Sequence, residues 1–100
     1  MVTGLPAGYL FRLKHGRVVE EFNRLMHSAV LPLLKKEKGF RQDLTVLGDN
    51  TGMSVSVWDD RASAESYNTS TYPEVLEKLD SVLEGTPRVD TYDTILAMAR

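Results

Sequence analysis

The side chains that could do chemistry gather around Trp58, the single tryptophan of the chain. Ser54, Ser56 and Trp58 occupy alternate positions in the segment from Met53 to Asp60. Successive side chains of a strand point to opposite faces of its sheet, so these three residues share one face. Two short hydroxyl side chains beside an indole leave room above them, as the wall of a pocket would. The alternative is that Trp58 simply closes the core between sheet and helix.

Tyr67 adds a phenolic hydroxyl after this segment, and further tyrosines occur at Tyr9, Tyr72 and Tyr92. A phenol in a pocket can donate a hydrogen bond to a bound carbonyl or orient a bound phenol. Tyrosines at the edges of sheets and helices more often bury the ring and leave the hydroxyl in water. The candidate catalytic residues, acting by stacking, positioning and acid–base help, are Trp58, Tyr67 and Ser54.

The sequence lacks the groups that metals and most cofactors require. It contains no cysteine, which excludes disulfides, thiolate metal ligands and a cysteine nucleophile. His15 and His27 lack a partner at the spacing of a metal site and are predicted to be solvated. No glycine-rich phosphate-binding loop occurs. We therefore predict no metal and no cofactor.

Composition predicts one soluble domain over residues 1–100, with a loose N-terminal arm over 1–7. The formal net charge of −2 argues against nucleic acid as a partner. No apolar run approaches the roughly 20 residues of a membrane span, and Met1 to Ala7 has no signal-peptide pattern. We expect a cytoplasmic protein with no membrane partner. Arg12 and Arg41 lie on predicted strands, where each could bind an anion or pair with Asp43 at a dimer interface.

Hydrophobic periodicity predicts strands near 8–15, 40–47, 53–58 and 88–98, and helices near 17–36 and 61–84. In the first helix, Pro32 should cause a kink or break near Val30 to Leu33, since an interior proline costs about 3 kcal/mol. A five-residue loop over 48–52 should supply positive φ angles for a hairpin.

The second helical region is predicted to begin at an N-cap formed by Asp59 or Asp60. Its first part, rich in Ser, Asn and Thr, should form one or two turns only. Thr71 and Glu74 have the spacing of a capping box, which predicts a restart of the helix.

This order of elements predicts an α+β, ferredoxin-like βαββαβ fold with a four-stranded antiparallel sheet and both helices on one face. If Trp58 faces the helices, then Leu10, Met53, Val55 and Val57 lie on the bare face. An apolar patch of this kind predicts a homodimer that forms through the sheet face.

The segment Val57-Trp58-Asp59-Asp60, followed by Ala64-Glu65, Tyr67 and Ser70-Thr71-Tyr72, resembles the antibiotic biosynthesis monooxygenase (ABM-like) domain, and the resemblance covers nearly the whole chain in element order. It implies a dimeric α+β barrel in which each pocket lies between sheet and helices.

Trp58 matches the strand-end tryptophan of the cofactor-independent branch of this family. The asparagine of that branch, four residues earlier, is replaced by Ser54, and its helical tyrosine falls at Ala64, so that Tyr67 lies nearly one turn further on. The haem-degrading branch fits worse, because its iron-ligating histidine falls near Glu77.

The resemblance implies a cofactor-independent monooxygenase that acts on a small aromatic or quinol-like molecule. The alternative is a non-catalytic homodimer that binds a small ligand or has a structural role. An enclosed cavity of about 300 Å³ or more, onto which Trp58, Ser54 and Tyr67 converge, would favour the enzyme.

Overall fold

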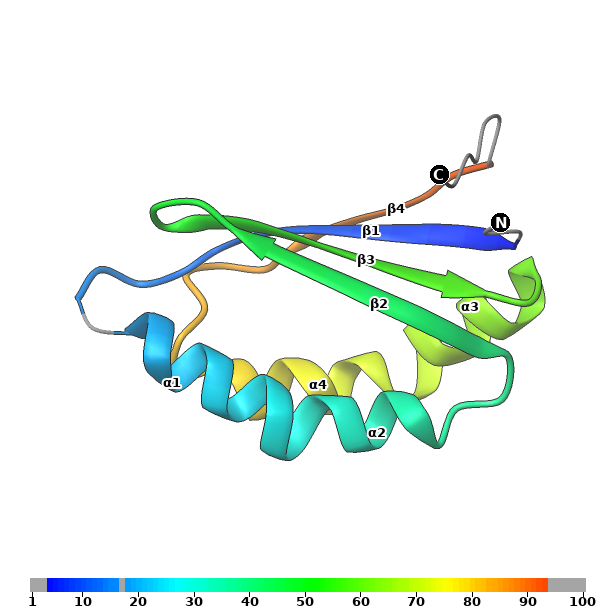
Figure 1. Cartoon of the computed structure of the whole chain (residues 1–100), viewed down its shortest axis with the longest axis horizontal. Coiled ribbons are helices and arrows are strands. Elements are labelled where there is room, and N and C mark those ends of the chain that lie inside the picture. Colours follow the sequence, from blue (N-terminus) through cyan, green and yellow to red (C-terminus); the bar gives the residue numbers. More distant parts are fainter. Residues whose placement is uncertain (1–3, 17, 94–100) are drawn as a thin grey trace, which may run out of the picture.

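The computed structural model describes residues 4–16 and 18–93 and shows a sheet with helices on one face (Figure 1). All neighbouring strands are antiparallel, in the order β2-β3-β1-β4. The strands are β1 (Leu5–Arg12), β2 (Phe40–Leu47), β3 (Thr51–Trp58) and β4 (Arg88–Thr91). The helical segments are α1 (Val18–Leu25), the π-helical η1 (Met26–Val30), α2 (Leu31–Lys35), α3 (Arg61–Ser70) and α4 (Tyr72–Leu79). The predicted α+β, ferredoxin-like βαββαβ fold is confirmed.

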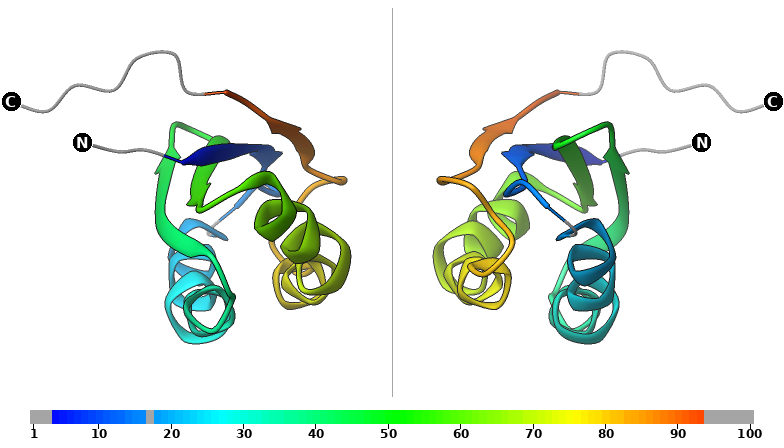
Figure 2. Two further views of the ribbon diagram at one scale, coloured as in Figure 1. Left: turned by 90° about the vertical axis from the view of Figure 1, so that its right-hand side faces the viewer. Right: turned by 90° about the vertical axis from the view of Figure 1, so that its left-hand side faces the viewer.

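The helices form one layer, in which the segment α1–η1–α2 lies beside α3 and α4 against one face of the sheet. No described element covers the opposite face (Figure 2). Between the sheet and the helices lies a single apolar core, formed by Ala7, Tyr9, Phe11, Leu13, Phe22, Val30, Leu34, Trp58, Ala64, Tyr67, Val75, Leu79, Val82 and Leu83. Within the described ranges, no helix has the length and apolar character needed to cross a membrane.

The uncovered face of the sheet carries large apolar side chains. Leu10 pairs with Met53 across β1 and β3, and Met53 pairs with Val46 across β3 and β2. All three are exposed, as is Leu44, whose exposed fraction is 59%. We call Leu10, Leu44, Val46 and Met53 the open-face patch.

The first strand starts earlier than predicted, at Leu5, and ends at Arg12. Leu5–Ala7, expected in the loose arm, instead continue the ladder until Leu5 lies opposite Trp58. Gly4, with a φ of 129°, packs against the Trp58 backbone, so this glycine marks the turn into the strand. At the other end of the chain, β4 ends at Thr91, and residues 94–98 of the predicted last strand lie outside the described residues.

Within the helix predicted over 17–36, the helical segments follow one another without a break from Val18 to Lys35, and the irregularity expected near Pro32 is the π turn η1 that precedes it. The Leu31 N–H donates to the Met26 carbonyl, five residues earlier, which is the π-helical pattern. In a regular α-helix the proline ring would clash with the carbonyl four residues earlier, at Ser28. The wider turn that precedes Pro32 relieves this conflict, and the proline then occupies the first turn of α2.

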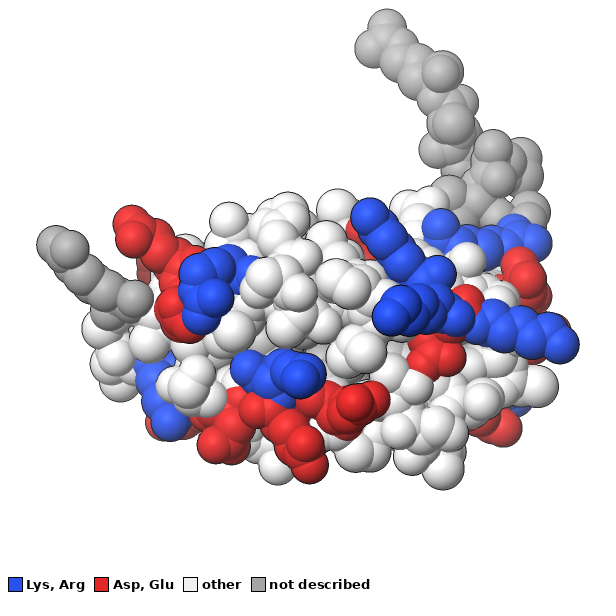
Figure 3. Space-filling view, turned by 90° about the horizontal axis from the view of Figure 1, so that it is seen from below, with Lys and Arg blue, Asp and Glu red and all other residues white. Residues whose placement is uncertain are grey.

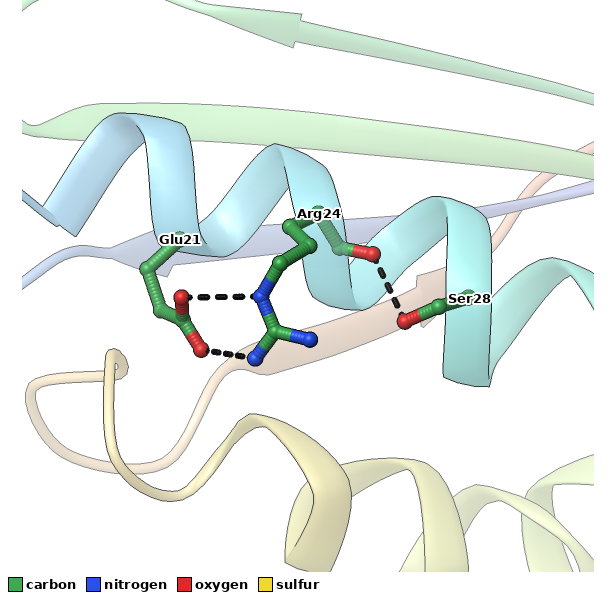
Figure 4. Close-up of polar contacts among 3 residues, drawn as sticks. All are labelled: Glu21, Arg24 and Ser28. Carbon is green, nitrogen blue, oxygen red and sulfur yellow. Dashed lines mark hydrogen bonds and ion pairs between the residues drawn. The ribbon is translucent and has the colours of Figure 1, made fainter.

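Polar contacts link successive turns on the exposed side of this helix (Figure 4). Arg24 forms an ion pair with Glu21, and the Ser28 hydroxyl donates to the Arg24 carbonyl at 2.8 Å. A serine that bonds back to a carbonyl four residues earlier often bends a helix. Ser28 lies within η1, so this hydrogen bond falls in the same segment as the π turn.

The second helical region begins and divides where predicted, between Ser70 and Tyr72, but differs in three details. Asp60 is the N-cap, and its carboxylate accepts the Ser63 N–H at 2.8 Å. α3 then runs for 10 residues, longer than the one or two turns expected. Thr71 has helical backbone angles and makes no side-chain cap, so the predicted capping box is wrong. The helix ends at Leu79 and not near 84.

The β2–β3 hairpin contains a bulge and a loop that is shorter than predicted. β3 begins at Thr51, and the Gly48 N–H donates to the Thr51 carbonyl at 2.9 Å. No described residue of the loop has a positive φ, so that expectation is wrong. In the ladder, Phe40 pairs with Trp58 and Gln42 with the adjacent Val57, which leaves Arg41 as an extra residue.

Candidate functional site

A small cavity of about 50 Å³ lies between the sheet and the helices. Aromatic and aliphatic side chains from both layers form most of its wall, and three polar side chains of β2 and β3 complete it. The lining residues are Tyr9, Phe11, Phe22, Met26, Val30, Leu34, Asp43, Ser54, Ser56, Tyr67, Tyr72, Val75, Leu76, Leu79, Leu83 and Pro87. The space is several times smaller than a typical small-molecule pocket of about 300 Å³ or more.

Asp43 and Ser54 of the cavity wall form a hydrogen-bonded group with Thr45, which lies outside the cavity lining. The Ser54 hydroxyl donates to Asp43 Oδ1 at 2.8 Å, and the Thr45 hydroxyl donates to Asp43 Oδ2 at 2.8 Å. Thr45 lies directly opposite Ser54 in the ladder. Ionised carboxylate oxygens have about four lone-pair sites in total, so Asp43 keeps acceptor capacity for a further donor.

Trp58 is completely buried and does not line the cavity. Its indole N–H donates to the Ser56 hydroxyl at 2.9 Å. Its ring packs against Tyr67, with ring centroids 4.9 Å apart, and edge-on against Phe40 at 5.6 Å. Of the three candidate catalytic residues, Ser54 and Tyr67 therefore face the cavity, and Trp58 supports the Tyr67 ring from behind.

Three tyrosines form a cluster at the cavity. The ring centroids of Tyr9 and Tyr72 are 5.0 Å apart, and those of Tyr67 and Tyr72 are 6.0 Å apart. Burial raises the pKa of Tyr9 to about 12, and burial also raises the pKa of Tyr67 and of Tyr72. The Tyr9 hydroxyl donates to Asn68 Oδ1 at 2.7 Å. These phenols stay protonated near neutral pH, so Tyr67 is suited to donate a hydrogen bond and not to remove a proton.

A more open groove of about 420 Å³ lies beside the cavity, where α1 and η1 pass β2. Phe22, Met26 and Asp43 line both spaces and therefore separate them. Val19, Glu20, Asn23, His27, Leu31, Thr45 and Leu47 complete the groove. A ligand larger than the cavity would extend into this groove.

Asp43 and Thr45 are the site residues that the sequence analysis missed. Asp43 was interpreted as an ion-pair partner of Arg12 or Arg41, but Arg41 Nε contacts Asp59 Oδ1 at 2.6 Å. Asp43 instead lies opposite Ser56 in the regular part of the ladder, two residues before Thr45, and therefore on the helix-covered face. The sequence did contain a signal for these residues. Asp43 and Thr45 are polar, share one face of β2, and lie on a strand that pairs with the segment of Ser54 and Ser56.

The described residues hold no group of three His, Cys, Asp or Glu side chains that could bind a metal. His15 Nδ1 lies 3.0 Å from Asn50 Nδ2, and His27 lies on the groove. On the helix side of the molecule, basic and acidic side chains are intermixed and neither sign covers the face (Figure 3).

The sequence matches no protein-family model and no curated protein, but solved structures share its fold. A monooxygenase from the gene ActVA-Orf6 of Streptomyces coelicolor, in complex with nanaomycin D, superposes with a TM-score of 0.80 at 15% identity, over 98% of this chain and 93% of that one. SnoaB, a cofactor-independent oxygenase from Streptomyces nogalater, gives 0.77 at 14% identity, over 99% and 100%. NE2512 from Nitrosomonas europaea, a protein of unknown function, gives 0.78 at 19% identity, over 98% and 95%.

The fold is therefore the ABM-like fold, and the resemblance found in the sequence is confirmed at that level. Proteins with this fold include cofactor-independent monooxygenases and proteins of unknown function.

Proposed function

We propose that this protein binds a small aromatic or quinol-like molecule between its sheet and its helices and acts on it as a cofactor-independent monooxygenase. The observation that carries the proposal is the cavity wall, in which tyrosine and phenylalanine rings face a carboxylate–hydroxyl group. Apolar walls with a few convergent polar groups are typical of small-molecule sites. The ABM-like fold of the two oxygenases supports the enzymatic part.

The chemistry asks little of the protein beyond positioning. A phenol that donates an electron to dioxygen can take up one oxygen atom as a ring carbonyl, while the other oxygen atom leaves as water. The aromatic wall would hold the ring and exclude water, and the protonated Tyr67 hydroxyl would donate to a ring oxygen. Ser54 would act with Asp43 at the polar end of the cavity. Trp58 would hold Tyr67 in place without touching the substrate.

The second candidate function is a non-catalytic homodimer that binds a small ligand or has a structural role. The small volume of the cavity favours it, because the space is several times smaller than a typical small-molecule pocket. The complete burial of Trp58 away from the cavity also favours it.

Oxygen uptake distinguishes the two functions. Metal-stripped protein is tested with a panel of dihydroxy-aromatic compounds, beside Tyr67→Phe and Ser54→Ala. We expect turnover by the wild type and a loss of about 10²-fold or more in Tyr67→Phe, which keeps the ring but has no donor. Turnover that is absent across the panel would favour the non-catalytic function. So would turnover that is the same in both variants as in the wild type.

We also propose that the protein is a homodimer formed through the open-face patch. The patch is made of four exposed apolar side chains on adjacent strands. Exposed apolar surfaces of this kind commonly mark interfaces between proteins.

A further inference from the structure

Asp43 is the only charged side chain among the described residues that line the cavity. It also lines the neighbouring groove, where the other ionisable side chains are Glu20 and His27. No lysine or arginine of the described chain lines either space. A ligand that occupies both spaces must therefore pass Asp43, the one carboxylate of the described residues that lines both.

The partners of Asp43 leave it able to bind a ligand. Its two oxygens accept the hydroxyls of Thr45 and Ser54, and the ion pairs found in the described part of the chain do not include it. Two hydroxyl donors do not neutralise a carboxylate, and about half of its acceptor sites remain open. A donor on the ligand would find a pre-oriented acceptor, whereas an anionic ligand would meet an unneutralised like charge.

We propose that Asp43 is the specificity-determining residue of this site, and that it selects aromatic ligands with a neutral hydroxyl group over ligands with a carboxylate. The inference rests on the proposed function, because it assumes that the site binds an aromatic molecule. The ring would lie against the tyrosine and phenylalanine side chains, and the ligand hydroxyl would donate to Asp43 where cavity and groove meet.

The test uses three probes that share one ring and differ in one group: β-naphthol, its methyl ether and β-naphthoate. Binding to the wild type is measured by equilibrium dialysis, with calorimetry as a second method. Removal of one hydrogen bond to a charged group typically costs a factor of about 10 to 100 in affinity. We therefore expect naphthol to bind about 10-fold or more tightly than its ether, and naphthoate to bind most weakly.

The variant Asp43→Asn keeps the shape of the side chain and removes its charge. We expect it to bind naphthol about 10-fold more weakly and naphthoate more tightly than the wild type does. Tighter binding of one probe cannot arise from damage to the fold. Asp49→Asn, in the exposed hairpin loop, loses the same charge outside the site and should keep the wild-type order.

The outcomes separate this inference from the proposed function. If the wild type binds none of the probes at millimolar concentration, both are wrong. If it binds all three with similar affinity, or if Asp43→Asn keeps the wild-type order, aromatic binding stands and the role of Asp43 is overturned. Because the comparison of probes on the wild type requires no variant, a failure of Asp43→Asn to fold does not prevent the test.

Discussion

Trp58 lies in the core as a support for the residues that face the cavity. It has no exposed surface, and it contacts Tyr67, Phe40 and the Ser56 hydroxyl. We therefore expect Trp58 to contribute to the stability of the fold and not to contact a ligand directly.

Replacement of Trp58 by Phe should lower the free energy of unfolding by about 2 kcal/mol. The smaller ring leaves a void beside Tyr67 and takes away the donor to Ser56. Tyr67→Phe is the matched control, because it keeps the ring, and we expect it to change the free energy by less than about 1 kcal/mol. Urea unfolding measures both. A Trp58→Phe protein of wild-type stability but without ligand binding would place Trp58 in the site itself.

The buried tyrosines predict a loss of stability in alkaline solution. Tyr9 ionises near 10.0 in the unfolded chain, whereas its pKa in the folded protein is about 12. Below pH 10 the Tyr9 hydroxyl is protonated in both states, and its contribution to the free energy of unfolding is fully present. As the pH rises from 10 to 12, the folded state keeps a proton that the unfolded state has lost, so the free energy of unfolding falls by about 1.4 kcal/mol per pH unit.

The raised pKa values of Tyr67 and Tyr72 should add to this slope. Urea unfolding at a series of pH values measures the slope, and absorbance of the tyrosinate form shows when ionisation occurs. Tyr9→Phe should make the slope shallower. A free energy of unfolding that is constant from pH 9 to 11 would contradict burial of these three hydroxyls.

At the scale of elements, the long helix shows how a strongly unfavourable residue can be absorbed. Pro32 follows the π turn of η1 and lies in the first turn of α2. In that position its missing N–H matters little. The cost of about 3 kcal/mol that applies to an interior proline should therefore not apply here.

Pro32→Ala is consequently expected to change the free energy of unfolding by less than about 1 kcal/mol in either direction. Urea unfolding tests this, and Asn23→Pro, at an exposed position past the first turn of α1, is a control for a true interior proline, with an expected loss of about 3 kcal/mol or more. Stabilisation of Pro32→Ala by close to 3 kcal/mol would show that the proline strains the helix.

The sequence predicts the elements of this protein better than it predicts the site. Alternation and helical periodicity identify β2 within its observed bounds and place Trp58 toward the helices, because burial of one face imposes these patterns. Alternation shows that Asp43 and Thr45 share one face of β2, but it does not reveal that this face, and not the face with Leu44 and Val46, is the one covered by the helices. The size of the cavity depends on how side chains of eight helices and strands fill the space between them, and a linear pattern contains no measure of volume.

At the scale of the whole molecule, one face of the sheet is packed and the other is apolar and uncovered (Figure 2). A chain of 100 residues buries a modest part of its surface on folding. Association through the open-face patch would bury more apolar area.

Leu44→Asp should yield a monomer at low micromolar concentration. In the single chain Leu44 is 59% exposed, so water can hydrate the new carboxylate, whereas burial in a dimer interface would cost several kcal/mol. Val55→Asp, on the same face, should act in the same way. Sedimentation equilibrium measures the mass, and Val19→Asp, exposed on α1, is the control that should remain dimeric. If Leu44→Asp and the wild type have the same dimer mass, another surface forms the interface.

The bulge at Arg41 also determines where chains with this fold can differ in length. In-frame loss of the Arg41 codon would remove the bulge and still leave Asp43 opposite Ser56, since the ladder on either side is regular. Loss of Leu44 would instead move Thr45 to the open face and Val46 into the cavity wall. Insertions and deletions should therefore be tolerated at position 41 and selected against two or three residues later, so alignments of related sequences should place their gaps at the start of β2.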